Sequence, residues 1–176
     1  MRFKTMFRYD NKQEVDIISF CEELKASKEE FEVYIGTDSK FEQGEITYTT
    51  VIAFRFGNRG VRGIFRKFSE IHQDFEKYQK KIVKKSHKRE RNRKDLRYEI
   101  YSRLKKETEL SLEVAEYVKA ILTIKQIDLD YNSKEMWLSH MMVEECKVLC
   151  ECRGFKTSVK NTSMPQVATI FADKIL

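Results

Sequence analysis

Three strand-like segments that follow one another with only short turns between them constrain the fold of this chain most strongly. Residues 31–38, 46–56 and 61–68 are rich in β-branched and aromatic residues, which are typical of strands. The tetrapeptides "EQGE" (residues 42–45) and "GNRG" (residues 57–60) separate them, and their glycines can adopt the positive φ angles of tight turns. Because such short connections join only antiparallel neighbours, the three segments should form an antiparallel meander.

The rest of the chain alternates between helical and strand-like patterns. Residues 11–27 and 95–122 carry apolar residues at helical spacing, whereas residues 125–130 and 156–160 have the character of short strands. The two short strands flank a helix, so they should lie parallel through a right-handed crossover. We therefore expect an α/β (mixed α+β) fold. Its five-stranded mixed sheet would have three antiparallel and then two parallel strands, with helices on both faces and an additional N-terminal helix.

Capping patterns indicate where the last two helices begin. Asn132 and Glu135 form a capping signature for the helix between the two short strands, and Gly154 fits the position just after its last turn. Ser163 and Gln166 form a second capping box, which predicts a final helix from there to the C-terminus.

Two aspartates lie at the ends of strands that this arrangement makes neighbours. Asp38 lies at the carboxyl end of the first strand and Asp130 at the carboxyl end of the fourth. Ligands of open parallel sheets bind at those ends. Two close carboxylates raise each other's pKa unless a cation lies between them, so a divalent cation with oxygen ligands is expected. Asp128 is the alternative to Asp130 because it points to the same face of the strand. Gly36 leaves room for another chain or a substrate backbone.

A block of positive charge inside the chain predicts a polyanionic partner. The 176 residues carry a formal net charge of +6, whereas residues 77–97 alone hold eleven Lys or Arg residues against two acidic residues, a net charge of +9. Such a block favours nucleic acid over a merely solvated helix or loop. A docking surface for another protein is the alternative. The candidate nucleic-acid-binding residues are Lys40, Lys80, Lys81, Lys84, Lys85, Lys88, Arg89, Arg91, Arg93 and Lys94.

Other classes of protein lack support in the sequence. No apolar run of about 18 residues could span a membrane, and the N-terminal residues lack the apolar region of a signal peptide, so a cytoplasmic protein without a membrane partner is expected. No P-loop, G-x-S-x-G elbow or G-x-G-x-x-G motif occurs. Cys146, Cys150 and Cys152 form a C-x3-C-x-C pattern that fits structural zinc poorly, so reduced thiols are expected. The length fits a single domain, residues 1–176, with a basic insertion at about residues 72–95.

Four short motifs, in their order and spacing, resemble those of the ribonuclease H superfamily. They are "VYIGTDSK", "RLKKETELSLEVAEY", "IDLDYNSK" and "ADKI". The combination is similar to the YkuK-like group of ribonuclease H-like bacterial proteins, and the resemblance covers about residues 13–176. It implies four carboxylates around two Mg²⁺ (or Mn²⁺) ions. Asp38 and Asp130 match the strand aspartates of the superfamily.

The remaining two carboxylates would come from helices. The resemblance places a glutamate roughly two dozen residues before the strand-4 aspartate, which matches Glu107, and Glu109 is its rival. Glu107 also shares a helix face with Leu and Val residues, which suits a site better than a position among lysines. Asp173 in "FADKIL" matches the fourth carboxylate, although it lies deeper in its helix than the superfamily usually has it.

The expected function is that of a metal-dependent nuclease. The resemblance implies hydrolysis of phosphodiester bonds by a two-metal mechanism, with Asp38 bridging the ions, Glu107 and Asp130 holding one and Asp173 the other. RNA, an RNA–DNA hybrid or structured DNA would be the substrate. The alternative is a noncatalytic nucleic-acid-binding module with the same fold, in which residues 77–97 carry the function.

Overall fold

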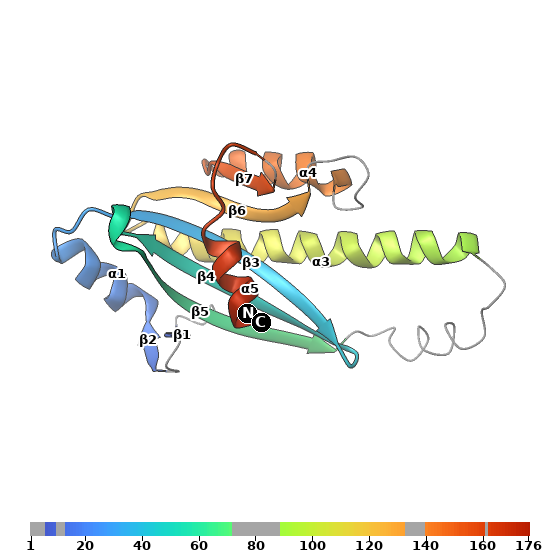
Figure 1. Ribbon diagram of the computed structural model, residues 1–176, viewed down its shortest axis with the longest axis horizontal. Coiled ribbons are helices and arrows are strands. Elements are labelled where there is room, and N and C mark those ends of the chain that lie inside the picture. Colours follow the sequence, from blue (N-terminus) through green and yellow to red (C-terminus); the bar gives the residue numbers. More distant parts are fainter. Residues whose placement is uncertain (1–5, 10–12, 72–88, 133–139, 161) are drawn as a thin grey trace.

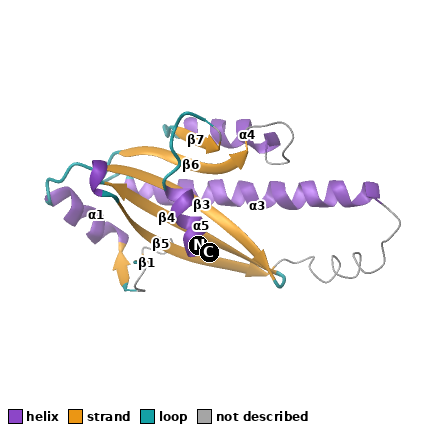
Figure 2. Cartoon of the chain, viewed as in Figure 1, coloured by secondary structure: helices purple, strands orange, loops and turns teal. Residues whose placement is uncertain are grey.

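A mixed sheet of seven strands forms the centre of the described part of the chain (Figures 1 and 2). The computed structural model describes residues 6–9, 13–71, 89–132, 140–160 and 162–176, and of residues 89–99 and 141 it describes the backbone only. The strands lie in the order β2-β1-β5-β4-β3-β6-β7. The α/β class is therefore confirmed, but the sheet has two strands more than the five that the sequence predicted.

The central meander is confirmed. Strands β3 (Glu32–Glu42), β4 (Glu45–Arg55) and β5 (Val61–Ile71) pair antiparallel along their whole lengths. Gln43 and Gly44, both with positive φ, form the first turn, and a 3₁₀ turn bounded by glycines with positive φ forms the second. Strands β3 and β5 run beyond their predicted ends, so that β3 continues four residues past Asp38.

The parallel half of the sheet is also confirmed. Strand β6 (Ile124–Asn132) pairs parallel to β3, with Gly36 opposite Asp128 and Thr37 opposite Leu129. Strand β7 (Thr157–Lys160) pairs parallel to β6. Asp38 and Asp130 directly follow Thr37 and Leu129, the last pair of the parallel ladder, so they lie side by side on adjacent parallel strands; Asp38 is not the end of β3, however, because that strand continues to Glu42.

The N-terminal segment corrects the prediction of one helix over residues 11–27. Strands β1 (Met6–Arg8) and β2 (Glu14–Asp16) form a hairpin that joins the edge of β5, and only Ile17–Ala26 is helical (α1). The Asp16 carboxylate accepts the Ser19 N–H at 3.1 Å and so fixes the first residue of α1. The helical spacing was correct from Ile17 onward, but pairing with the sheet decided the residues before it.

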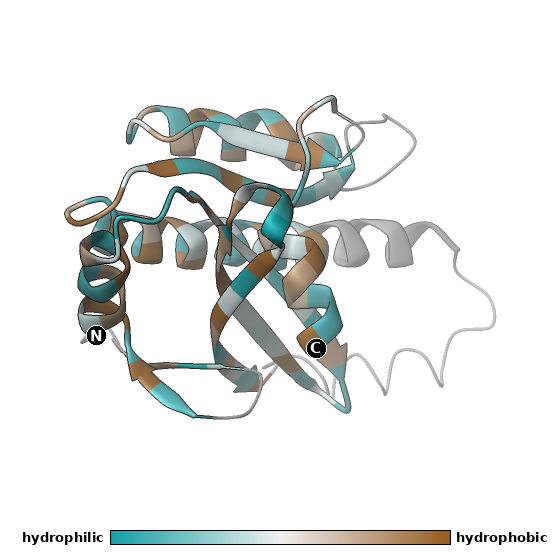
Figure 3. Cartoon of the chain, turned by 60° about the vertical axis from the view of Figure 1, so that its left-hand side comes forward, coloured by the Kyte–Doolittle hydropathy of each residue, from teal (hydrophilic) through white to brown (hydrophobic). Residues whose placement is uncertain are grey.

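Helices cover both faces of the sheet. On one face α1, α3 (Arg89–Val118) and α4 (His140–Glu151) enclose the larger apolar core; on the other, α5 (Ala168–Ile175) covers a smaller cluster around Tyr34 and Phe65. Figure 3 shows apolar and polar positions along these elements.

The sequence made a prediction for each end of the helix between β6 and β7. Asn132 is the last residue of β6, and Glu135 lies outside the described residues, so the predicted capping pair stays a prediction. The prediction for Gly154 is confirmed: its φ is +84°, and the Phe155 N–H donates to the Cys150 carbonyl across it.

Candidate functional site

Strand β3 presents its side chains alternately to the two helical layers. Thr37 and Ser39 face α3, where they bond to side chains of that helix. Gly36 faces α5, and by the same alternation Asp38 projects on the α5 side. The half-buried Asp38 carboxylate accepts the Ser39 N–H at 2.8 Å.

Three carboxylates influence one another at this end of the sheet. The pKa of Asp38 is raised to about 6, first by burial and then by the negative charges of Asp130 and Asp173, while the Ser39 hydrogen bond and Lys160 oppose the rise. Asp173 projects from α5 and is exposed. The structure thus brings Asp38, Asp130 and Asp173 into one electrostatic neighbourhood, as the sequence predicted.

Glu107 on α3 is the most unusual of the acidic residues. Its residue surface is only 3% exposed, Ser39 Oγ donates to its Oε1 at 2.5 Å, and its Oε2 has no hydrogen-bond partner. Burial raises the pKa of Glu107 to about 8; the Ser39 hydrogen bond and Arg103 oppose this, and Asp38 and Asp130 add to it. The rival Glu109 is exposed, so the two glutamates are clearly distinguished.

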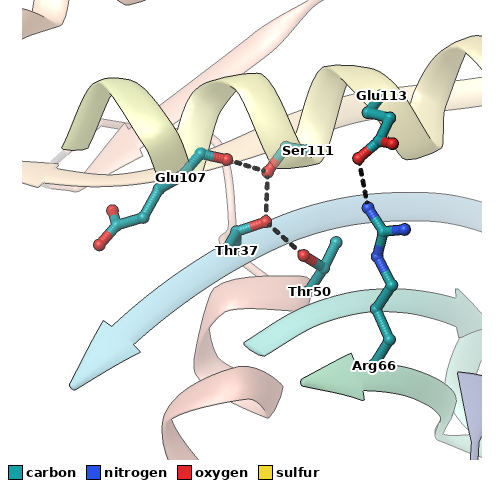
Figure 4. Close-up of polar contacts among 6 residues, drawn as sticks. All are labelled: Thr37, Thr50, Arg66, Glu107, Ser111 and Glu113. Atoms are coloured by element: carbon teal, nitrogen blue, oxygen red, sulfur yellow. Dashed lines mark hydrogen bonds and ion pairs between the residues drawn. The ribbon is translucent and has the colours of Figure 1, made fainter. Parts of the chain in front are cut away.

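A row of hydroxyl groups inside the apolar core explains why Glu107 is held against β3. Thr50, Thr37 and Ser111 form a chain of hydrogen bonds of 3.0 and 2.9 Å from β4 through β3 to α3, where Ser111 also donates to the Glu107 carbonyl (Figure 4). Each buried hydroxyl is satisfied only in one register of helix against strand. In Figure 4 the Glu107 carboxylate extends away from Ser111.

Asp130 forms an ion pair with Lys160. Lys160 Nζ lies 2.5 Å from Asp130 Oδ1, and the lysine side chain is about half exposed. The β6–β7 ladder is regular up to Leu129 opposite Val159 and then skips to Asn132 opposite Lys160. A regular ladder would have set Lys160 opposite Asp130, whereas the irregularity sets it opposite Asn132, so the lysine reaches Asp130 through its long side chain.

Asp128 has a structural role that the sequence did not reveal. It is fully buried, and its Oδ2 accepts the N–H groups of Val167 and Ala168 at 2.6 and 2.7 Å, while Gln126 Nε2 donates to its Oδ1 at 2.7 Å. Asp128, which the sequence offered as the alternative to Asp130, instead caps α5 from a neighbouring strand.

Two related predictions fail for the same reason. The Ser163–Gln166 capping box does not form, since α5 begins at Ala168 without a side-chain cap from its own segment. Gln166 instead donates to the Leu129 carbonyl at 2.6 Å. The space above Gly36 is filled by the start of α5 rather than by a substrate: a Cβ there would lie 2.9 Å from Thr169 Cγ2 and 3.1 Å from the Asp128 carbonyl oxygen.

The candidate carboxylates have the oxygen ligands that a divalent cation prefers, but they do not form a compact cluster. Among the described residues, no three His, Cys, Asp or Glu side chains already gather closely enough to hold one ion. Glu107, on α3, packs against one face of β3, whereas Asp38 projects from the other face, which agrees with that finding. The unpartnered buried Oε2 of Glu107 and the raised pKa values of Glu107 and Asp38 are nevertheless what carboxylates show when a nearby positive charge is missing. The four cysteines are free thiols.

Most of the predicted nucleic-acid-binding residues cannot be placed. Lys80, Lys81, Lys84, Lys85 and Lys88 lie outside the described residues, and Arg89, Arg91, Arg93 and Lys94 are described only as backbone at the start of α3. Lys40 is exposed and pairs with Glu42 at 2.8 Å.

Sequence reasoning missed Ser39, Lys160 and Arg103. Strand alternation in "TDSK" could have placed Ser39 opposite Asp38, and Lys160 ends the strand next to Asp130. Arg103 lies one turn before Glu107, and its Nη1 donates to the Ser39 carbonyl at 3.4 Å. This last contact depends on the packing of α3, which no local pattern specifies.

Comparisons with known proteins add no relative. No protein-family model, curated protein or solved structure matches the chain. Separately, none of the helices in the described ranges is both long and apolar enough to cross a membrane.

Proposed function

We propose that this protein is a divalent-cation-dependent nuclease of ribonuclease H-like fold that hydrolyses phosphodiester bonds of RNA or of structured nucleic acid. The strand order β5-β4-β3-β6-β7 supports the proposal, because an antiparallel meander continued by two parallel strands is the arrangement that the resemblance implies. The β1–β2 hairpin would be an addition at its edge.

The proposal rests mainly on Glu107, whose buried Oε2 has no hydrogen-bond partner among the described residues. A buried carboxylate oxygen without a partner is costly, and a bound ion is one of the arrangements that satisfy such a group. Asp38 and Asp130 lie close enough to raise its pKa further, so additional negative charge surrounds it. A cation would satisfy the orphaned oxygen and relieve the repulsion together.

Each carboxylate would have a separate role. Asp38, at the centre of the sheet edge, would bridge between ions; Glu107 and Asp130 would hold one and Asp173 the other. Bound ions would supply activation of the attacking water and stabilise the charge on the leaving 3′-oxygen. Ser39 would hold the Glu107 carboxylate in position, with Oε1 fixed and Oε2 available.

Helix α3 connects this site with the basic segment. It begins at Arg89, within residues 77–97, and reaches the site at Glu107. At the usual helical rise those two positions are about 27 Å apart, which is less than one turn of a nucleic-acid duplex. Figure 1 shows the N-terminal turns of α3 extending beyond the sheet. One bound duplex could therefore contact the basic segment and reach the carboxylates.

A noncatalytic nucleic-acid-binding module is the second candidate. Lys160 already neutralises Asp130, and the described residues contain no preformed cluster of three ligands. In such a module the acidic residues would not take part in function, and the basic segment would carry the binding.

Single-turnover cleavage assays separate the two candidates. The substrates are an RNA–DNA hybrid, duplex RNA, single-stranded RNA and branched DNA, each with Mg²⁺, with Mn²⁺ and with a chelator. We expect metal-dependent cleavage of at least one substrate, and Asp38→Asn should slow it at least about a hundredfold without weakening nucleic-acid binding.

Glu109→Gln is the matched control, because it removes one carboxylate from the same helix at an exposed position. It should retain the rate of the parent protein. Cleavage that survives both chelation and Asp38→Asn would contradict the proposed site. Binding without cleavage of any substrate would favour the noncatalytic module.

A further inference from the structure

Lys160 is the only basic side chain that pairs with a candidate carboxylate ligand among the ion pairs of the described residues. Its Nζ contacts Asp130 Oδ1 at 2.5 Å, and its charge also opposes the raised pKa of Asp38. The positive charge of Lys160 therefore lies where a divalent cation would have to approach Asp130.

The side chain of Lys160, rather than the strand register, makes this contact. Lys160 ends β7 opposite Asn132, two residues beyond Asp130, and its Nζ reaches back to the Asp130 carboxylate. The contact is exposed on the lysine side, where the side chain is 46% exposed, so the ammonium group can leave Asp130 without unfolding the strand. Long lysine side chains have several rotatable bonds and adopt new positions readily.

We propose that Lys160 is a built-in counter-ion of the site: it neutralises Asp130 in the metal-free protein, competes with the divalent cation for that carboxylate, and after its displacement contacts a phosphate of the bound nucleic acid. The inference rests on the proposed function, since it assumes that Asp130 takes part in holding the cation. It adds a role for a residue that no motif identified. Asp130 would then exchange one positive partner for another, so that its carboxylate is never left unpaired beside Asp38.

Manganese binding tests the competition. Titration calorimetry with Mn²⁺ alone is applied to the parent protein, Lys160→Gln and Lys160→Arg. Loss of the competing charge should tighten Mn²⁺ binding in Lys160→Gln by about threefold or more, the size expected for a partly exposed ion pair. Lys160→Arg keeps the charge and should bind as the parent does.

The control variant is Lys156→Gln. Lys156 is exposed at the residue before the first position of β7, so the substitution makes the same change in net charge away from Asp130. Its Mn²⁺ affinity should equal that of the parent. A general effect of net charge would tighten both Gln variants equally and would overturn the inference.

A second measurement tests the phosphate contact. Binding of a short RNA–DNA hybrid is measured in Ca²⁺ at several salt concentrations. Lys160→Gln should bind more weakly than the parent protein, and the slope of log K against log salt should fall by about one, as expected for one lost phosphate contact. An unchanged slope would overturn this part of the inference.

The outcomes also separate this inference from the proposed function. If neither the parent nor Lys160→Gln binds Mn²⁺, both are overturned. If the parent binds Mn²⁺ and Lys160→Gln binds with the same or lower affinity, only the role of Lys160 is overturned. Mn²⁺ binding by Lys160→Gln alone would support the inference, because the lysine would then block the site.

Discussion

Two buried carboxylates, Asp128 on the α5 side of the sheet and Glu107 on the α3 side, differ in how the chain satisfies them. Asp128 is fully buried, and it accepts two backbone N–H groups at the start of α5 and the side-chain amide of Gln126. Glu107 is almost as deeply buried, yet one of its oxygens has no partner and two other carboxylates act on it. The described residues thus supply hydrogen bonds to both oxygens of Asp128, whereas they leave Oε2 of Glu107 without one. The comparison shows that burial of an acid does not by itself mark a functional site. The informative feature is whether the chain supplies its hydrogen bonds.

Removing the Asp128 carboxylate tests whether its hydrogen bonds stabilise the fold. In Asp128→Ala the N–H groups of Val167 and Ala168 lose their acceptor, so we expect the free energy of unfolding to fall by about 3 kcal/mol. Chemical denaturation measures the change. Asp130→Ala, two residues further along the strand, is the matched control and should cost less, about 1 kcal/mol, because a partly exposed ion pair contributes little. Equal losses would remove the distinction between the two aspartates.

The pH dependence of stability tests the second carboxylate of the comparison, Glu107. Burial raises the pKa of Glu107 to about 8 and that of Asp38 to about 6, both above the ordinary values of carboxyl groups. The folded protein therefore holds protons that the unfolded chain releases. Stability from these groups is fully present below the unfolded pKa and is lost as the pH rises through the folded pKa.

We expect the metal-free protein to lose roughly 2 kcal/mol of unfolding free energy between about pH 5 and about pH 8 through Glu107. Denaturation in the presence of a chelator, compared with Glu107→Gln, isolates this contribution, because the variant cannot titrate at that position. The difference between the two proteins should grow with pH. A constant difference over this range would mean that Glu107 is ionised throughout and already has a positive partner.

The sequence predicted the strand pairing and the Asp38–Asp130 pair because those follow from short-range signals. Turn residues fixed the meander, and strand ends placed the two aspartates at one edge. It failed at Asp128 because a carboxylate that caps α5 from 39 and 40 residues away leaves no local pattern. The first turn of α5 contains no cap of its own, so the Ser163–Gln166 box was a reasonable but wrong reading. Similarly, only the packing of α3 on β3 distinguishes Glu107 from Glu109 in physical terms.

Removing the Ser39 hydroxyl tests whether its hydrogen bond holds the Glu107 carboxylate in position for a cation. Of the predicted effects, this one should be the smallest. Its bond to Oε1 fixes the carboxylate and lowers the pKa of Glu107 against the effect of burial. In Ser39→Ala we expect Mn²⁺ affinity to fall by about threefold to fivefold, as for one hydrogen bond to a charged group. The pH-dependent loss of stability should also move to higher pH, because the opposing effect on the pKa is gone. Ser111→Ala is the control, since Ser111 bonds to Thr37 and to the Glu107 carbonyl but not to the carboxylate. Both variants could instead weaken Mn²⁺ binding equally, without a shift in the pH dependence of stability. The hydroxyl groups would then only support the packing of α3, and the Ser39 hydrogen bond would not be needed to position the Glu107 carboxylate.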